Sequence, residues 1–335
     1  MTNKFPVKNT VILFIASLLA VLIPLLLMRT NVLDAYTVLI ITMGGVNAIM
    51  AISVNTIVGI TGQLSLGQAG FLAIGAYGCI FFNLDVGLPM PLAAACSVII
   101  TTFVGFSIGF PVLKLSGDYL AIVTLGFGEI IRVVFINLKS ITGGPNGRQF
   151  TTIMKLNNVL AFTVVTLVLI IVLALLQNFL RSSYGRAIKA CREDEIAANA
   201  NGIDIFRYKM AGFVIAAFIA GIGGCLYAMV VGLVQPANAQ FLRSIDYLIF
   251  VVLGGMGSMT GSVLAAYTLT ALQELLRFLP RSLQDTRLIF YAVILILVMI
   301  FRPKGLLGMK EFSFVRSWDS LVFFVKGKFR RKELS

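Results

Sequence analysis

The chain has 335 residues, of which 59% are hydrophobic and only 12% are charged. Water-soluble domains carry roughly a quarter of charged residues, so this composition excludes an ordinary soluble fold. The sequence contains no histidine, which excludes a histidine-based metal site and Ser-His-Asp catalysis. Its four cysteines have no paired spacing, so they indicate neither a zinc site nor a disulfide framework.

The net charge of +13 is concentrated in two regions of the chain. Nine of the 27 Lys and Arg residues follow Phe301, and six more lie between Arg181 and Lys209. Both groups flank long apolar runs, where basic residues mark the cytoplasmic side of a membrane. This placement favours a membrane protein over a nucleic-acid binder. It also predicts that a thiol reagent reaches Cys191 only from the cytoplasmic side.

Apolar runs of about 20 residues, the length needed to cross a bilayer, recur along nearly the whole sequence. We predict an all-α polytopic membrane protein with ten transmembrane helices, the first retained rather than cleaved as a signal peptide. The predicted spans are 10–28, 36–58, 66–83, 92–113, 118–137, 158–180, 210–233, 245–257, 260–279 and 286–301.

An even number of spans places both termini in the cytoplasm, with the polar segment 181–209 on the same side. The transmembrane domain is then 10–301, after a short cytoplasmic N-terminus at 1–9. The basic tail, 302–335, contains apolar and aromatic residues that favour an interfacial helix over an eleventh span. The predicted external loops are 29–35, 84–91, 138–157 with the tight turn "TGGPNG", 234–244 and 280–285.

Glycines interrupt two of the predicted spans. They are Gly59, Gly62, Gly67 and Gly70 around the third span, and Gly254, Gly255 and Gly257 in the eighth. The eighth span is also too short to cross a bilayer as a straight helix. Broken helices are tolerated at membrane depth only where they are buried in protein or line a polar cavity. Both segments run on to an Ala-Tyr pair, which indicates either a repeat around a transport path or close packing through small residues.

The stretch "CREDEIAANANGID", residues 191–204, is a polar island between two apolar runs. Alanine and glutamate favour a helix here, predicted at 192–201, and Gly202 suits a left-handed stop. Such a helix presents a small-residue face to a partner's groove, or it is a solvated loop helix without a partner. The candidate partner-contact residues are Arg192, Glu193, Glu195, Ala197, Ala198 and Gly202.

The spacing E-x-A-A-x-x-x-G in this island resembles the EAA loop of ABC importer permeases, although the pattern is looser here. Further motifs resemble the M-type permease of branched-chain amino acid ABC importers, the Liv system, from about residue 36 to 308. They are "TGQLSLGQAGF", "SGDYLAIVTLGFGEIIR", "TGGPNG", "GRAIKACREDEIAANANGID" and "VVLGGMGSMTGSVLAA".

The resemblance implies a permease in the bacterial cytoplasmic (inner) membrane. It also implies four kinds of contact: a homologous second permease subunit, two ATP-binding cassette ATPase subunits that dock on the 192–201 helix, a solute-binding protein at the external loops, and membrane lipid. It implies no covalent chemistry in this chain.

The sequence contains no G-x-x-x-x-G-K-[ST] motif, and "GGMGSMTG" lacks the lysine of such a loop. We therefore expect no nucleotide site, no cofactor and no metal in this chain. ATP would be bound and hydrolysed on the partner subunits.

Polar residues within the predicted spans are candidates for the translocation path. Glu129 and Arg132 lie three residues apart on one helix face, as a pore element or as a self-neutralising structural pair. We expect the path to use mainly neutral polar groups and broken-helix backbone, whose other role would be hydrogen bonding between helices. The path candidates are Asn47, Asn55, Gln63, Ser65, Gln68, Thr124, Glu129, Gly254, Gly255 and Gly257.

Three other functions fit parts of the sequence. A secondary transporter could use Glu129 or Glu274 as a proton relay, but buried acids are scarce. A membrane scaffold without transport does not account for two broken helices. A permease for urea or short amides is the alternative within the ABC class, because such subunits resemble the amino acid branch.

Overall fold

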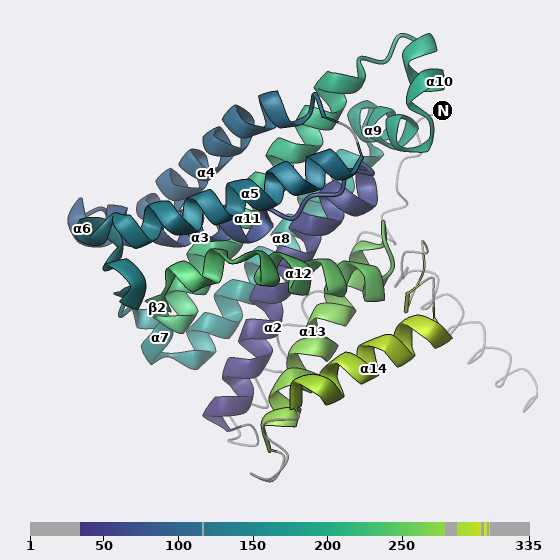
Figure 1. The fold of residues 1–335 in the computed structure, drawn as a ribbon. Helices are drawn as coiled ribbons and strands as arrows, with labels where there is room; N and C mark the ends of the chain where they lie inside the picture. Colours follow the sequence, from purple (N-terminus) through teal and green to yellow (C-terminus); the bar gives the residue numbers. More distant parts are fainter. Residues whose placement is uncertain (1–33, 116, 279–286, 303–304, 307, 309–335) are drawn as a thin grey trace, which may run out of the picture.

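The computed structural model describes residues 34–115, 117–278, 287–302, 305–306 and 308 (Figure 1). The predicted N-terminus 1–9, the first predicted span 10–28 and the tail beyond 308 lie outside the described residues.

Within the described ranges, nine helical segments follow the remaining predicted spans in order, because each apolar run is continuous enough to hold one helix. They are α2 (Ala35–Val54) with a π-helical extension η1 (Asn55–Ile60), α3 (Gln68–Ile80) with η2 (Phe81–Asp85), α4 (Met90–Val112), α5 (Asp118–Asn137), α8 (Asn158–Arg181), α11 (Ile205–Val231), α12 (Phe241–Gly254), α13 (Met259–Leu275) with η5 (Leu276–Phe278), and α14 (Arg287–Phe301).

Short elements connect these helices. They are α6 (Lys139–Thr142), η3 (Gly144–Asn146), β1 (Arg148–Gln149), α7 (Ile153–Leu156), α9 (Ser183–Glu193), α10 (Glu195–Ala200), β2 (Leu233–Val234) and η4 (Pro236–Ala239).

The described part is a multi-span helical membrane protein. Five of its helices are long and apolar enough to cross a bilayer: Ala35–Ile60, Met90–Val112, Asp118–Asn137, Asn158–Arg181 and Ile205–Val231. The others are shorter than the roughly 20 residues that a bilayer requires. The all-α class is confirmed, and the total of ten spans stays a prediction.

Two helices, α2 and α11, form the centre of the bundle. Their apolar windows are 67% buried, compared with 22% for α5. α11 packs against α2, α3 and α4, and α2 packs in turn against α8 and α13. Backbones approach closely along the seam between α3 and α11, where a Cβ built on Gly75 would lie 2.5 Å from the carbonyl oxygen of Gly221. Small residues permit this contact, as in other membrane helix pairs.

Three loops that the sequence assigns to the external side meet at one end of the bundle. β1 pairs antiparallel with β2, with Arg148 opposite Val234. The guanidinium of Arg148 donates to both carboxylate oxygens of Asp85, at 2.5 and 2.7 Å, and it holds the pKa of Asp85 below its usual range. This ion pair therefore persists at pH values where a free aspartate is partly protonated.

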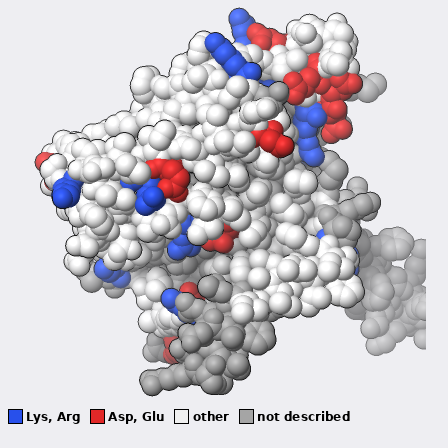
Figure 2. All heavy atoms as spheres, viewed as in Figure 1, with Lys and Arg blue, Asp and Glu red and all other residues white. Residues whose placement is uncertain are grey.

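The opposite end carries α9 and α10, far from β2, α6 and α7 (Figure 1). Figure 2 shows acidic and basic side chains gathered over this end, whereas the surface over the long helices is mostly uncharged. Large hydrophobic side chains are exposed along α4 and α5, including Phe103, Tyr119 and Ile122. Exposed apolar side chains along the long helices, with charged side chains at the end of the bundle, are the distribution expected of a protein whose helices are surrounded by a bilayer.

Candidate coupling segment and transmembrane cavity

The polar island folds as two short helices, so the single helix predicted at 192–201 is wrong. α9 ends at Glu193 and α10 begins at Glu195. Asp194 separates them in an extended conformation, and its carboxylate accepts hydrogen bonds from the backbone amides of Ile196 and Ala197, at 2.9 and 3.0 Å. Aspartate is among the strongest N-cap residues, so this local bond begins a new helix and ends the previous one.

The left-handed stop predicted at Gly202 is confirmed. Its φ is +77°, and the two hydrogen bonds of a Schellman motif close α10. The amide of Ile203 donates to the carbonyl of Ala198 at 3.1 Å, and the amide of Gly202 donates to that of Asn199 at 2.9 Å.

The small face of α10 does not face outward as a whole, which corrects the predicted docking surface. Ala198 is 4% exposed and packs inside this chain, whereas Ala197 is exposed. The apolar side chain that α10 presents to solvent is Ile196, which is 84% exposed. Sequence reasoning passed over Ile196, although an isoleucine inside a charged stretch was a usable signal.

Two of the predicted partner-contact residues instead hold the segment to the membrane part. The Glu195 carboxylate pairs with the ammonium of Lys209, at the start of α11, at 2.5 Å. Arg192 donates to the backbone carbonyl of Gly59, which lies in η1. Glu193 remains exposed at the end of α9. The segment is therefore fixed to the bundle through α9 and α10, with Ile196 facing outward.

Cys191 is a poor topology probe, contrary to the sequence prediction, because only 2% of it is exposed. Burial also raises the pKa of its thiol, and the thiolate is the form that reacts. We expect an impermeant maleimide to leave Cys191 unmodified at neutral pH both in intact cells and in inverted vesicles. A Ser183→Cys variant places an exposed thiol at the start of α9 and should be modified in inverted vesicles only. Modification of that variant in intact cells would reverse the predicted topology.

The two predicted helix interruptions are confirmed, and the structure brings them together. Residues 61–67 between η1 and α3 are not helical, and Gly255 and Gly257 adopt φ values of 106° and 91°. Asn55 joins the two breaks: its side-chain amide donates to the carbonyl of Ser258 at 3.0 Å and accepts from the amide of Gly257 at 2.8 Å. We call the region held together by these two Asn55 hydrogen bonds and by the Arg192 bond to Gly59 the junction.

Four other path candidates are buried in contacts around the first break. Gln63 accepts a hydrogen bond from Thr61 at 3.3 Å. Thr124 of α5 accepts one from the amide of Leu66 at 3.0 Å. Gln68 is fully buried, and its oxygen accepts from the hydroxyl of Ser53 at 2.9 Å. The hydroxyl of Ser65 and the side-chain nitrogen of Gln68 have no hydrogen-bond partner within the described residues.

Glu129 serves as a structural residue in this conformation. Its carboxylate pairs with Arg132 at 2.6 Å, and its second oxygen accepts from the amide of Phe241 at 3.2 Å. Phe241 is the first residue of α12, and a helix N-terminus favours a nearby negative charge. The contacts support the self-neutralising pair, one of the two roles that the sequence left open.

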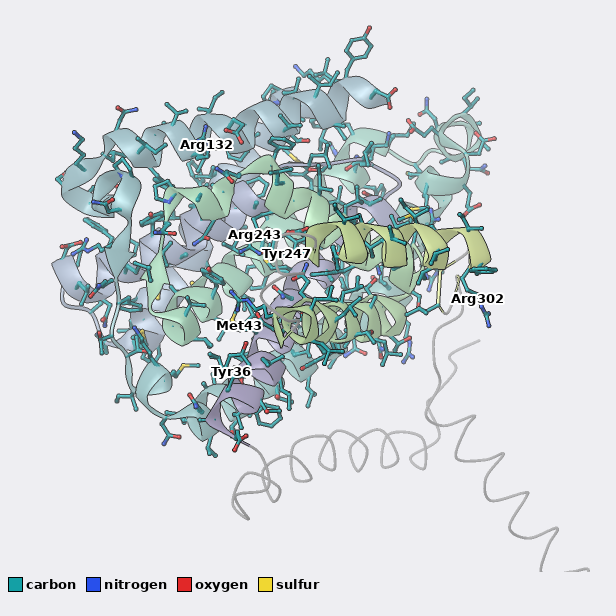
Figure 3. All side chains as sticks on the ribbon, turned by 60° about the horizontal axis from the view of Figure 1, so that its bottom comes forward. Tyr36, Met43, Arg132, Arg243, Tyr247 and Arg302 are labelled. Carbon is teal, nitrogen blue, oxygen red and sulfur yellow. The ribbon has the colours of Figure 1, made fainter. Side chains whose placement is uncertain are left out.

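A cavity of ≈ 500 Å³ lies between α2, α3, α11, α12, α13 and α14. Of the ten path candidates, Asn47 lines it, and the Asn47 amide donates to the hydroxyl of Thr270 at 2.9 Å. Figure 3 shows Met43 of α2 close to Arg243 and Tyr247 of α12 around this space. The cavity thus adjoins α2 and α11 at the centre of the bundle, and α12, the helix that ends at the junction.

Ionisable side chains line this cavity, whereas the sequence predicted mainly neutral groups. Glu274 and Arg277 pair at 2.9 Å at the end of α13, where Tyr36 at the start of α2 also donates to Glu274 at 2.6 Å. Arg243 and Asp246 line the cavity from α12. Sequence reasoning missed both, although Asp246 lies inside the predicted eighth span, where an ionisable residue is itself a functional signal.

Three features define a multi-span transport protein of the permease class. Two interrupted helices meet inside the membrane part, a polar cavity lies beside them, and a helical segment lies at one end of the bundle. Comparison with known proteins gives the family. Residues 36–299 match the family described as the permease component of the branched-chain amino acid transport system, and the chain belongs to that family.

The high-affinity branched-chain amino acid transport system permease protein LivM of Salmonella typhimurium is 36% identical over 264 residues, covering 70% of this chain. LivM of Escherichia coli gives the same identity and coverage. The match spans 61% of each of these LivM proteins, so it leaves more than a third of their length unmatched. LivH of E. coli is 32% identical over 149 residues, 44% of this chain and 47% of that protein.

Proposed function

We propose that this chain is the permease subunit of an ABC-type importer that moves branched-chain amino acids across the bacterial cytoplasmic membrane. Its membership of the branched-chain permease family and its 36% identity to LivM support the substrate class. One structural observation carries the mechanism: the α9–α10 segment exposes Ile196 and is bonded through Arg192 to the junction.

In this proposal, two ATPase subunits bind and hydrolyse ATP, and this chain contributes no catalytic residue or nucleotide site. One ATPase subunit contacts Ile196 and the exposed surface of α10. When ATP binding closes the ATPase pair, α10 is displaced, and α9 is displaced with it. Arg192 then transmits the displacement to the carbonyl of Gly59.

From Gly59 the displacement reaches α12. Asn55 lies in the same element, η1, and is bonded to both Gly257 and Ser258 just beyond α12. Since α12 lines the cavity, a shift at the junction changes the access to that cavity. This chain of hydrogen bonds and short helices is a physical route from the cytoplasmic end to the transport path.

The remaining partners belong to the same proposal. A homologous second permease completes the path, and a solute-binding protein delivers the amino acid to the external end. The β1–β2 pair and the Asp85–Arg148 ion pair cross-link the loops at that end. Ten spans with both termini in the cytoplasm place the α9–α10 segment on the ATPase side.

Uptake by the reconstituted complex tests the proposed function. The permease pair, the ATPase subunits and the solute-binding protein are placed in proteoliposomes, with ATP inside and the labelled solute and binding protein outside. We expect uptake of leucine, isoleucine and valine only when ATP is present. Uptake of urea with none of the three amino acids would establish the short-amide alternative, and uptake without ATPase subunits would establish a secondary transporter.

A further inference from the structure

We propose that Arg243 and Asp246 of α12 form a binding site inside the permease for the charged groups of a free α-amino acid. Arg243 binds the carboxylate, and Asp246 binds the ammonium. This inference rests on the proposed function but goes beyond it, because it places recognition of the substrate in this chain as well as in a solute-binding protein.

The position of the two side chains carries the proposal. Arg243 and Asp246 are three residues apart on α12, so they are neighbours on one helix face, with about 5–6 Å between their Cβ atoms. Both line the cavity. An amino acid carries its ammonium and carboxylate on one carbon atom, so both groups fit between two side chains that neighbour each other on a helix.

The bonding of the cavity charges distinguishes this pair from the others. Glu274 and Arg277 already neutralise each other, through hydrogen bonds of 2.9 and 3.0 Å. Within the described residues, neither Arg243 nor Asp246 has a side-chain hydrogen bond or a salt bridge within 4.0 Å. Arg243 is exposed and Asp246 is half-buried, and their opposite charges attract each other without such a bond. A half-buried carboxylate without a hydrogen-bond partner among the described residues is costly in a membrane protein, and such residues mark substrate or ion pathways.

The chemistry of the two groups matches the two ends of the ligand. A guanidinium offers a planar fork of N–H donors that binds a carboxylate through two parallel hydrogen bonds. A carboxylate accepts hydrogen bonds from an ammonium, which has three donors. A zwitterion therefore satisfies both side chains at once, whereas a urea molecule, which has no net charges, satisfies neither fully.

Part of the cavity lining suits a small apolar side chain. Met43, Leu72 and Tyr247 line the cavity together with Arg243 and Asp246 and contribute apolar surface to it. The volume of ≈ 500 Å³ lies within the usual range for small-molecule pockets and leaves room for water beside one amino acid. We therefore assign the site to free α-amino acids with hydrophobic side chains.

Direct binding to the purified complex of permeases and ATPases, without a solute-binding protein, tests the site. The probes are leucine, leucinamide, which lacks the carboxylate, and 4-methylpentanoate, which lacks the ammonium. We expect the wild-type complex to bind leucine at least about tenfold more tightly than either analogue, since each analogue lacks one of the two charge-assisted interactions. Arg243→Gln should remove the preference for leucine over leucinamide, and Asp246→Asn should remove the preference over 4-methylpentanoate.

The matched control is Arg207→Gln, which removes an exposed guanidinium at the start of α11, outside the cavity, and should leave the three affinities within about twofold. Arg243→Lys should retain part of the leucine preference, which separates a binding role from a folding role. The site is wrong if Arg243→Gln and Asp246→Asn weaken all three probes equally.

The outcome also separates this inference from the proposed function. A complex that takes up leucine in proteoliposomes but does not bind it without the solute-binding protein overturns the site and leaves the function intact. A complex that takes up no branched-chain amino acid overturns the function itself.

Discussion

Replacing Ile196 with aspartate is expected to abolish ATP-driven uptake while leaving membrane insertion of the chain unchanged. Ile196 is 84% exposed on α10, so the substitution removes little packing within this chain. Burying an isoleucine side chain at an interface contributes about 1.5–3 kcal/mol, and the variant would instead bury a carboxylate without a partner. Both effects oppose docking of an ATPase subunit.

Two measurements check this expectation: co-purification of the ATPase subunits with the permease, and uptake in proteoliposomes. Ile196→Met is the matched control, because it keeps an apolar side chain of similar size and should support uptake near the wild-type rate. If Ile196→Asp transports normally, α10 is not the docking surface. Ala198→Arg, which the sequence alone would recommend, tests internal packing instead, because Ala198 is buried.

Replacing Gly224 with valine should strongly destabilise the fold. A Cβ on Gly224 would overlap the carbonyl oxygen of Leu72 and lie 2.9 Å from the amide nitrogen of Ala76. Both are backbone atoms of α3, so no side-chain rotation relieves the clash, and α3 and α11 must separate. We expect a cost of about 3 kcal/mol or more, at the upper end of the range for overpacked cores.

The midpoint of thermal unfolding of the detergent-purified chain, monitored by size-exclusion chromatography, measures this loss of stability. Gly126→Val on α5 is the matched control, since no atom lies within 4 Å of a Cβ at Gly126. It should retain the wild-type midpoint within a few degrees. Equal losses in the two variants would mean that the contact between α3 and α11 is not what limits stability.

The positions of the long helices follow directly from the apolar runs. α5 has the predicted bounds, 118–137, and α4 begins and ends within two residues of the prediction. Hydrophobicity sets these bounds because a continuous apolar run must stay in the membrane. The division of residues 183–200 into α9 and α10 is less evident from the sequence than the bounds of the long helices. Alanine and glutamate favour helix on both sides of Asp194, and the capping bond that separates the helices is a local alternative to helix continuation.

The glycines in the sequence predicted the positions of the two helix interruptions, but they did not predict which residues contact each interruption. Asn55 and Gly257 are 202 residues apart, and Arg192 and Gly59 are 133 apart, so only the packing of the bundle brings them together. The same limit applies to the cavity. Ser65 and Gln68, predicted to line the path because they lie at a break, are buried in this conformation, and their role in the path stays a prediction. Arg243 and Asp246 point to a site only once α2, α11 and α13 are seen to surround them.

The junction also has a consequence for how the chain is made. Synthesis runs from the N-terminus, so η1 and the irregular segment 61–67 leave the ribosome long before Gly257 and Ser258. Until those residues arrive, the Asn55 amide and the Gly59 carbonyl lack the protein partners that they have in the finished structure. Lipid cannot satisfy them, and each unsatisfied group costs several kcal/mol there. The first broken helix must therefore stay hydrated, or sheltered by the insertion machinery, until most of the chain has been translated.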